Sequence, residues 1–169
     1  MFIYPNRYIL CVFRSPLADT DACMDIITSR FGRFEVQVDD VIRFPAGLLG
    51  LESCREWVLL ADVENDALAW LQSVERPEVA VAVVNPRRFV PEYQIRVVRR
   101  DLTALELDDP RRAQVLAILG KTEHTITLNL RAPLVINLEK RLGRQVVAIN
   151  DHPVQYELER GTPAFRKSA

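Results

Sequence analysis

The segment from Thr125 to Leu138 constrains the fold of this chain most, because apolar and polar side chains alternate along it. Ile126, Leu128 and Leu130 recur at every second position, which is the period of a β-strand with one buried face. Pro133 has no backbone N–H, so we expect it at a strand start, a bulge or a sheet edge. The segment therefore predicts consecutive antiparallel strands, and nothing in its pattern requires a ligand.

A polar turn follows this segment. Residues 139–143 end in Gly143, which is typical of a short hairpin loop with the glycine at a positive φ. The apolar residues of 146–149 then predict the returning strand. This end of the chain is therefore expected to contain a hairpin.

The same strand period recurs at intervals of roughly ten residues along the rest of the chain. Predicted strands cover residues 25–29, 34–38, 41–44, 57–61, 67–74, 79–84, 93–97 and 115–119. Helix is scarce: Ser53 to Glu56 matches a capping box that predicts one or two helical turns, and residues 101–107 favour one short helix. The spacing predicts an all-β fold, a compact antiparallel β-barrel of about nine or ten short strands with one or two short helices.

A length of 169 residues suits one domain. Met24 begins the first strand pattern, so residues 24–157 are predicted to form a single β-barrel domain. Residues 1–23 are expected to be a mis-called start or a disordered extension, and they lack the charged first region of a secretory signal. Residues 158–169 are expected to form a flexible tail.

The charge and the cysteine pattern exclude several classes of protein. A net charge of -1 and a pI near 6.2 argue against a protein that holds nucleic acid mainly by neutralising phosphates. Cys11, Cys23 and Cys54 form no C-x-x-C pair and fit a reducing, cytoplasmic compartment. No apolar run is long enough to cross a bilayer.

Patterns for catalysis and for metal binding are sparse. The two histidines, His124 and His152, have no metal-ligand spacing. Ser53, Ser73 and Cys54 have no partner histidine at a recognisable spacing, and no glycine-rich phosphate loop occurs. We therefore expect no enzymatic activity, no cofactor and no metal.

Four blocks of the sequence resemble one family of bacterial regulators. They are Arg30–Val36 with Val41–Gly50, Trp70–Ser73 with Pro77 and Val84–Pro86, Thr127–Asn137, and Gly143–Val147. Together, in this order and across most of the chain, they resemble FliW, the bacterial flagellar assembly factor family. Leu51 departs from the family pattern, which commonly has Phe there, and Asn85 stands where Asp is usual. The residues before the first strand are a further departure.

The resemblance implies a fold, a function and two partners. Members of the family are compact β-barrels without enzymatic activity that bind flagellin in the cytoplasm. They also bind CsrA, a small dimeric RNA-binding repressor of translation, and stop it from repressing flagellin synthesis. Flagellin and CsrA compete for the protein, so flagellin synthesis is coupled to secretion. The implied partners are therefore flagellin and CsrA, with no direct contact to nucleic acid or membrane.

The segment Trp70, Leu71, Gln72 and Ser73 has the composition of a partner-binding surface. An aromatic anchor beside hydrogen-bonding side chains is typical of an interaction hot spot. The alternative is that Trp70 fills the core while Gln72 and Ser73 end a strand. Gln72 is the better candidate for a partner contact if it points outward.

Two further pairs are partner-binding candidates, each with a structural alternative. Asn129 and Asn137 lie in predicted strands, where Asn is disfavoured. They either bond a bulged or turning backbone or anchor an added strand or peptide from flagellin. Leu48 and Leu49, in a loop with two glycines, either turn inward or contact a partner.

Charged side chains give a third candidate and a rival function. Glu64 and Asp66 are expected to meet a basic face of CsrA, unless they are simply solvated. Arginines also cluster in sequence, at Arg87, Arg88, Arg96, Arg99, Arg100, Arg111 and Arg112. They are either a solvated surface balanced by nearby acids or an RNA face. The alternative function is therefore a nucleic-acid- or small-ligand-binding β-barrel on the same scaffold.

Overall fold

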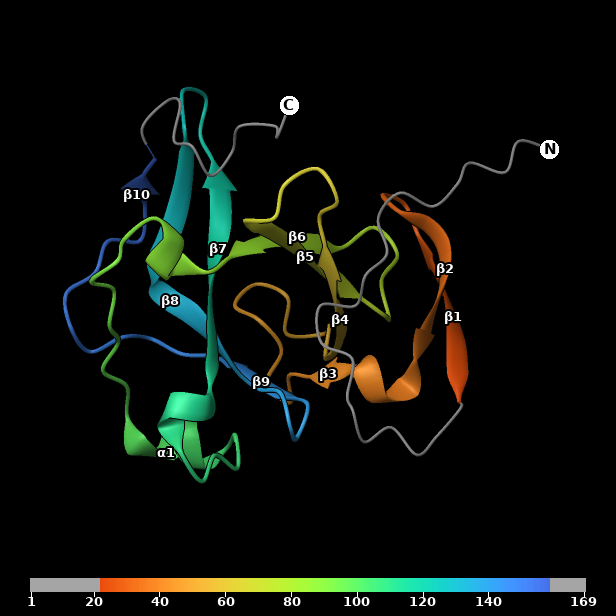
Figure 1. The fold of residues 1–169 in the computed structure, drawn as a ribbon, viewed down its shortest axis with the longest axis horizontal. Helices are drawn as coiled ribbons and strands as arrows, with labels where there is room; N and C mark the ends of the chain where they lie inside the picture. The colour runs from red at the N-terminus through yellow and green to blue at the C-terminus, as the bar shows by residue number, and fades with distance from the viewer. Residues whose placement is uncertain (1–21, 159–169) are drawn as a thin grey trace.

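The computed structural model describes residues 22–158, and in this range the fold is almost entirely β (Figure 1). The ten strands of the described range are β1 (Cys23–Thr28), β2 (Gly32–Gln37), β3 (Ile42–Arg43), β4 (Glu56–Ala61), β5 (Leu68–Ser73), β6 (Ala80–Val84), β7 (Gln114–Lys121), β8 (Ile126–Asn137), β9 (Leu142–Gln145) and β10 (Tyr156–Glu157). Helix is limited to α1 (Arg99–Thr103) and three single 3-10 turns, η1 (Val38–Asp40), η2 (Pro86–Arg88) and η3 (Pro110–Arg112). The predicted all-β fold is confirmed.

Seven of these strands close into a barrel. The hydrogen-bonded order runs β8-β7-β6-β5-β4-β3-β9, and β9 pairs again with β8. All but one of these pairings are antiparallel, as predicted; the exception is β3–β9, which is parallel through Arg43 and Leu142. The barrel is therefore closed by two strands from opposite ends of the described chain.

The barrel core and the face under the β1–β2 hairpin are built from alternate residues of the same strands. Trp57 and Leu59 of β4 belong to the large apolar cluster inside the ring. Their neighbours Val58 and Leu60 point to the opposite face, as the period of a strand requires. There they pack with Ile26, Phe31, Phe34 and Val36 of the hairpin. The hairpin, which lies beside β4 in Figure 1, thus buries part of the barrel's outer wall.

Gly143 has a different role from the one predicted. The residue of this turn at a positive φ is Arg141, not Gly143, which lies in β9. A Cβ at position 143 would overlap the ring of Phe44, a fully buried side chain. The glycine is therefore required for close packing between β9 and the barrel interior, and the predicted turn role is wrong.

Strand β8 is one continuous strand and passes through Pro133. Its pairing with β7 shifts in register between Leu116 and Ile118, so Pro133 lies at an irregularity where no ladder donor is needed. The side chain of Asn129 accepts a hydrogen bond from the backbone N–H of Ala132 at 2.9 Å. Of the three positions predicted for Pro133, a strand start, a bulge or a sheet edge, the structure shows the bulge. Residues 126–137 form one strand, although consecutive strands were predicted over this segment.

Three other local predictions are wrong. No helix starts at Ser53; the chain turns there and enters β4 at Glu56. Residues 93–97 form no strand, because the backbone N–H of Arg96 donates to the side chain of Asn150 and not to a neighbouring strand. The returning strand is β9, which ends before the predicted range 146–149.

The predictions for the two ends of the sequence concern residues that mostly lie outside the described range. Residues 1–21 and 159–169 lie outside it. Cys23 opens β1, one residue before the expected domain start. Leu158, expected in the tail, is buried, and its N–H donates to the carbonyl of Ile126.

Candidate functional site

The loop between β4 and β5 is held in one shape by its own side chains. One oxygen of Asp62 accepts the backbone N–H groups of Glu64 and Asn65, at 3.0 and 3.1 Å. Asn65 in turn accepts the N–H of Ala67 at 3.0 Å. Short Asp and Asn side chains form such turns because they reach backbone donors two or three residues ahead. The loop therefore presents Val63, Glu64 and Asp66 to solvent in a fixed arrangement.

Trp70 extends this loop into a larger surface. Its indole N–H donates to the second carboxylate oxygen of Asp62 at 3.1 Å. The guanidinium carbon of Arg30 lies 4.1 Å from the ring centroid, and the ring of Phe31 meets it edge-on at 5.9 Å. Trp70 is only partly buried. We call residues 62–66 together with Trp70 the acidic loop surface.

The acidic loop surface includes one ion pair. Asp66 lies 3.0 Å from Arg88, and this neighbour lowers the pKa of the Asp66 carboxyl. The carboxylate is fully exposed, so water screens the interaction. The pair places one of the clustered arginines against an acid, as the solvated-surface alternative expects.

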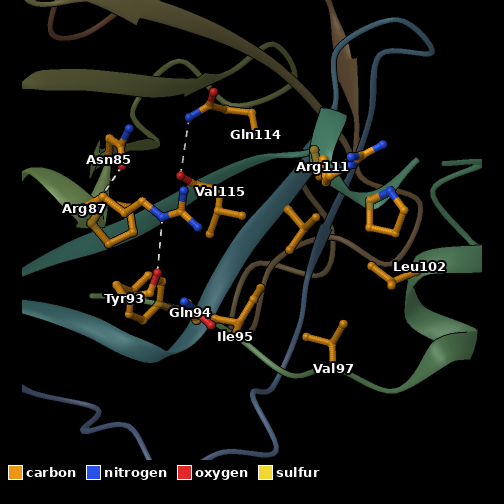
Figure 2. Close-up of a pocket in the computed structure, with 14 residues that line it drawn as sticks. Asn85, Arg87, Tyr93, Gln94, Ile95, Val97, Leu102, Arg111, Gln114 and Val115 are labelled. Carbon is orange, nitrogen blue, oxygen red and sulfur yellow. Dashed lines mark hydrogen bonds between the residues drawn. The ribbon is translucent and has the colours of Figure 1, made fainter. Parts of the chain in front are cut away.

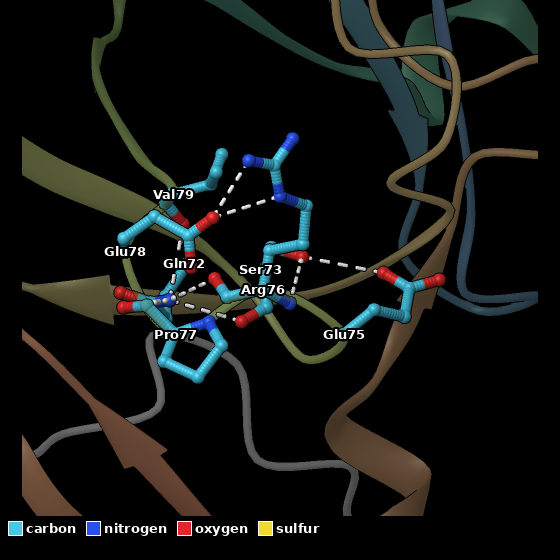
Figure 3. A network of polar contacts seen from close by, with 7 residues as sticks. All are labelled: Gln72, Ser73, Glu75, Arg76, Pro77, Glu78 and Val79. Carbon is cyan, nitrogen blue, oxygen red and sulfur yellow. Dashed lines mark hydrogen bonds and ion pairs between the residues drawn. The ribbon is translucent and has the colours of Figure 1, made fainter.

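Gln72 and Ser73 are buried and organise the turn from β5 to β6 (Figure 3). The amide nitrogen of Gln72 donates to the carbonyls of Ser73 and Val79, at 2.9 and 3.0 Å. The hydroxyl of Ser73 accepts the N–H of Arg76 at 3.1 Å. Gln72 therefore points inward, whereas its predicted role as a partner contact required an outward side chain. Leu71 is also fully buried, in the barrel interior.

Leu48 and Leu49 take opposite orientations. Leu48 is buried in the barrel cluster, whereas Leu49 is 67% exposed. The backbone N–H of Leu49 donates to the side chain of Gln145 at 2.9 Å, which fixes the loop against β9. Only the second of the two leucines is accessible to a partner in this structure.

Asn137 is buried and holds two segments together. Its amide nitrogen donates to the carbonyls of Leu105 and Glu106, at 2.9 and 3.2 Å. Its oxygen accepts the N–H groups of Glu139 and Lys140 in the following turn. Both predicted Asn residues thus bond turning or bulged backbone.

The ten predicted partner-binding residues are therefore not brought together at one place. Leu48, Leu71, Gln72, Ser73 and Asn137 are buried; Leu49, Trp70, Asn129, Glu64 and Asp66 are exposed or partly buried. Trp70, Glu64 and Asp66 share the acidic loop surface. Binding of a partner by any of these residues stays a prediction.

Sequence reasoning missed a groove of about 500 Å³ on the barrel wall beside α1 (Figure 2). Its lining comes from four separated stretches: residues 85–87, residues 93–97 with Leu102, residues 110–115, and Val135 of β8. The sequence signal for this groove is the alternation of apolar residues over 93–97, which predicts a strand. Its apolar residues line the groove instead.

Arg87 is fixed at one end of this groove. Its backbone N–H donates to the side chain of Asn85 at 3.0 Å, and its Nε donates to the carbonyl of Tyr93 at 3.2 Å. Figure 2 shows the guanidinium lying over the groove near Gln114 and Val115. The groove thus combines the fixed guanidinium of Arg87 with an apolar lining.

Over residues 22–158, no cluster of three or more His, Cys, Asp and Glu side chains is placed to hold a metal ion. In the same range no helix is both long and apolar enough to span a membrane.

Comparison with known proteins gives consistent matches. The family model described as "FliW protein" matches residues 25–158. The flagellar assembly factor FliW of Bdellovibrio bacteriovorus is 40% identical over 126 residues, covering 73% of this chain and 72% of the relative. That of Natranaerobius thermophilus is 35% identical over 136 residues, with 79% and 88% covered. A crystal structure of the flagellar assembly factor FliW superposes with a TM-score of 0.73 at 30% identity, covering 79% of this chain and 96% of that one.

Proposed function

The chain belongs to the FliW family of flagellar assembly factors, and from this premise we propose that it binds flagellin and the translational repressor CsrA in the cytoplasm. When this protein binds CsrA, it antagonises the binding of CsrA to RNA. Flagellin competes with CsrA for this protein. The role is that of a non-enzymatic adaptor that couples flagellin synthesis to secretion.

The acidic loop surface is the observation that supports the CsrA contact. A repressor that binds RNA needs a basic face to neutralise phosphates. Glu64 and Asp66 project from a loop that is already ordered, so little conformational entropy is lost when a basic partner docks. Exposed Val63 and partly buried Trp70 add apolar contact area beside these charges.

Calorimetric titration with the host's CsrA tests this proposal. The wild-type chain is compared with the variant Glu64→Lys/Asp66→Lys and with a control, Glu123→Lys/Glu157→Lys, which makes the same charge change at exposed sites elsewhere. We expect the first variant to bind at least about tenfold more weakly, because attraction becomes repulsion. The control should bind like the wild type.

Three results would contradict the proposal. Equal weakening by both variants would show that only net charge matters, not the acidic loop surface. If the heat of CsrA binding is undiminished after the chain has been saturated with flagellin, the two partners do not compete. Absence of heat with either partner would mean that the scaffold is shared with the family but the function is not.

A further inference from the structure

We propose that the groove beside α1 is a docking site for a partner polypeptide segment that carries an acidic side chain next to apolar ones. This goes beyond the proposed function, which places partner contact on the acidic loop surface.

The side chain of Arg87 is fixed in place but keeps hydrogen-bond donors available. Its Nε is used by the carbonyl of Tyr93, which holds the side chain in place. Among residues 22–158, no acidic side chain pairs with it, and its two terminal nitrogens have no hydrogen-bond partner. A planar guanidinium with both terminal nitrogens available is suited to bind a carboxylate in a bidentate manner.

Polar and apolar side chains are unevenly distributed along the groove. Figure 2 shows Asn85, Arg87 and Gln114 together at one end, and Val97 and Leu102 at the other, where Arg111 also lies. The guanidinium of Arg111 is already paired with Asp109 at 2.8 Å. Among the apolar lining residues, Ile95, Val97, Leu102 and Val115 are only partly buried, whereas Val135 is buried. An occupant with one carboxylate and adjacent apolar side chains matches this order.

Within the described part of the chain, the charged side chains around the groove leave an excess of unpaired arginines. Two acids that adjoin lining residues in sequence, Asp101 and Asp109, are each paired with an arginine, Arg144 at 3.1 Å and Arg111 at 2.8 Å. Three flanking arginines have no ion pair with a described residue: Arg96, Arg99 and Arg100. The remaining acids of this region, Glu92, Glu106 and Asp108, are exposed and do not line the groove. The surroundings thus favour an acidic segment over a basic one.

The volume and shape favour a polypeptide as the occupant. About 500 Å³ lies within the range of ligand sites. The lining, however, is drawn from segments spread along one wall of the barrel and partly exposed, which suits an extended or helical segment laid across it.

Amide chemical-shift titration of the whole chain tests the proposal with defined probes. They are an acetylated, amidated peptide of sequence Glu-Ala-Leu-Leu, its Gln-Ala-Leu-Leu counterpart, and octanoate as a small carboxylate. We expect the Glu peptide to shift the amides of Tyr93, Ile95 and Val115 saturably, and the Gln peptide to bind about tenfold more weakly.

Variants distinguish the groove from general charge effects. Arg87→Met should weaken the Glu peptide about tenfold, whereas Arg55→Met, an exposed arginine away from the groove, should not. If Arg87→Met does not fold, Leu102→Asp, which places a carboxylate at the apolar end, takes its place. Equal binding of the two peptides, shifts centred elsewhere, or shifts with octanoate alone would overturn the proposal. None of these results depends on CsrA or flagellin binding.

Discussion

The hydroxyl of Tyr93 donates a hydrogen bond to the carbonyl oxygen of Leu130 at 2.7 Å, between a segment without regular secondary structure and the middle of β8. Leu130 lies where β8 and β7 are out of register, so its carbonyl is available to a side chain. The backbone carbonyl of Tyr93 meanwhile accepts from Arg87. One residue thus connects the barrel wall to the cationic end of the groove.

Replacing Tyr93 with Phe should make stability less sensitive to high pH. Burial raises the pKa of Tyr93 from 10.0 to about 12. Between these values the unfolded chain has lost the phenolic proton and the folded chain keeps it. Stability therefore falls as pH rises through this window, by up to about 1.4 kcal/mol per pH unit. Urea unfolding of Tyr93→Phe at pH 10 to 12 should lack this contribution.

At neutral pH the same Tyr93→Phe variant should be less stable by about 1 to 2 kcal/mol, because the Leu130 carbonyl loses its buried donor. Tyr156→Phe, at an exposed position in β10, is the matched control. It should change neither the stability at neutral pH nor the fall in stability between pH 10 and 12. An unchanged pH slope in Tyr93→Phe would show that this phenol does not titrate abnormally.

Gly143→Ala should destabilise the barrel, because the added methyl group overlaps the ring of Phe44. We expect a loss of about 1 to 3 kcal/mol or more in the free energy of unfolding. Gly143→Ala combined with Phe44→Leu should lose less than the sum of the two single changes, since the smaller side chain makes room. Additive losses in urea unfolding would contradict a direct contact between the two positions.

Gln72→Glu should destabilise the protein more than Gln72→Leu. The amide nitrogen of Gln72 faces the carbonyls of Ser73 and Val79, and its oxygen is buried without a hydrogen-bond partner among the described residues. A carboxylate there would face oxygens and would be desolvated, whereas Leu only removes one donor from these carbonyls, and that of Val79 still accepts the backbone N–H of Ser73. Thermal unfolding at pH 7 compares the two, with Gln155→Glu, an exposed site, as the control.

Asn137→Ala should cost more stability than Asn129→Ala. Asn137 is 5% exposed and bonds backbone groups on two segments, whereas Asn129 is less buried and accepts the N–H of Ala132. Loss of one such bond costs about 1 kcal/mol, so we expect about 1 kcal/mol for Asn129→Ala and about 2 to 3 for Asn137→Ala. Equal losses in urea unfolding would mean that one of these contact sets is not maintained in solution.

Alternating apolar residues, together with a continuous apolar run at β6, were sufficient to locate β1, β2 and β4 to β8 to within two residues, because each of these strands buries one face or both. The same pattern wrongly predicted a strand at residues 93–97. Tyr93, Ile95 and Val97 do turn to the same side, but the backbone between them bonds Asn150 and Ile149 and not a strand ladder. Side-chain period reports which face is buried, not where the backbone hydrogen bonds go.

The candidate site was less predictable, since exposure depends on what covers a strand. Trp70 and Gln72 share one face of β5, and the hairpin covers part of that face while the β5–β6 turn closes over Gln72. The hairpin is remote from β5 in sequence. The β5–β6 turn follows β5 directly, but the strand pattern does not show that this turn folds back over Gln72. The groove was missed because its lining comes from four separated stretches of the chain.

The parallel pairing of β3 with β9 has a consequence for how the protein is made. Arg43 and Leu142 are neighbours although they lie roughly a hundred residues apart in the chain, so this contact raises the contact order of the fold. During translation, β3 has only β4 beside it until the last barrel strand has been synthesised. Loop-closure entropy opposes this final pairing until then. The nascent chain therefore completes its barrel only after β9 has been synthesised, and we expect closure to be the slow step of folding.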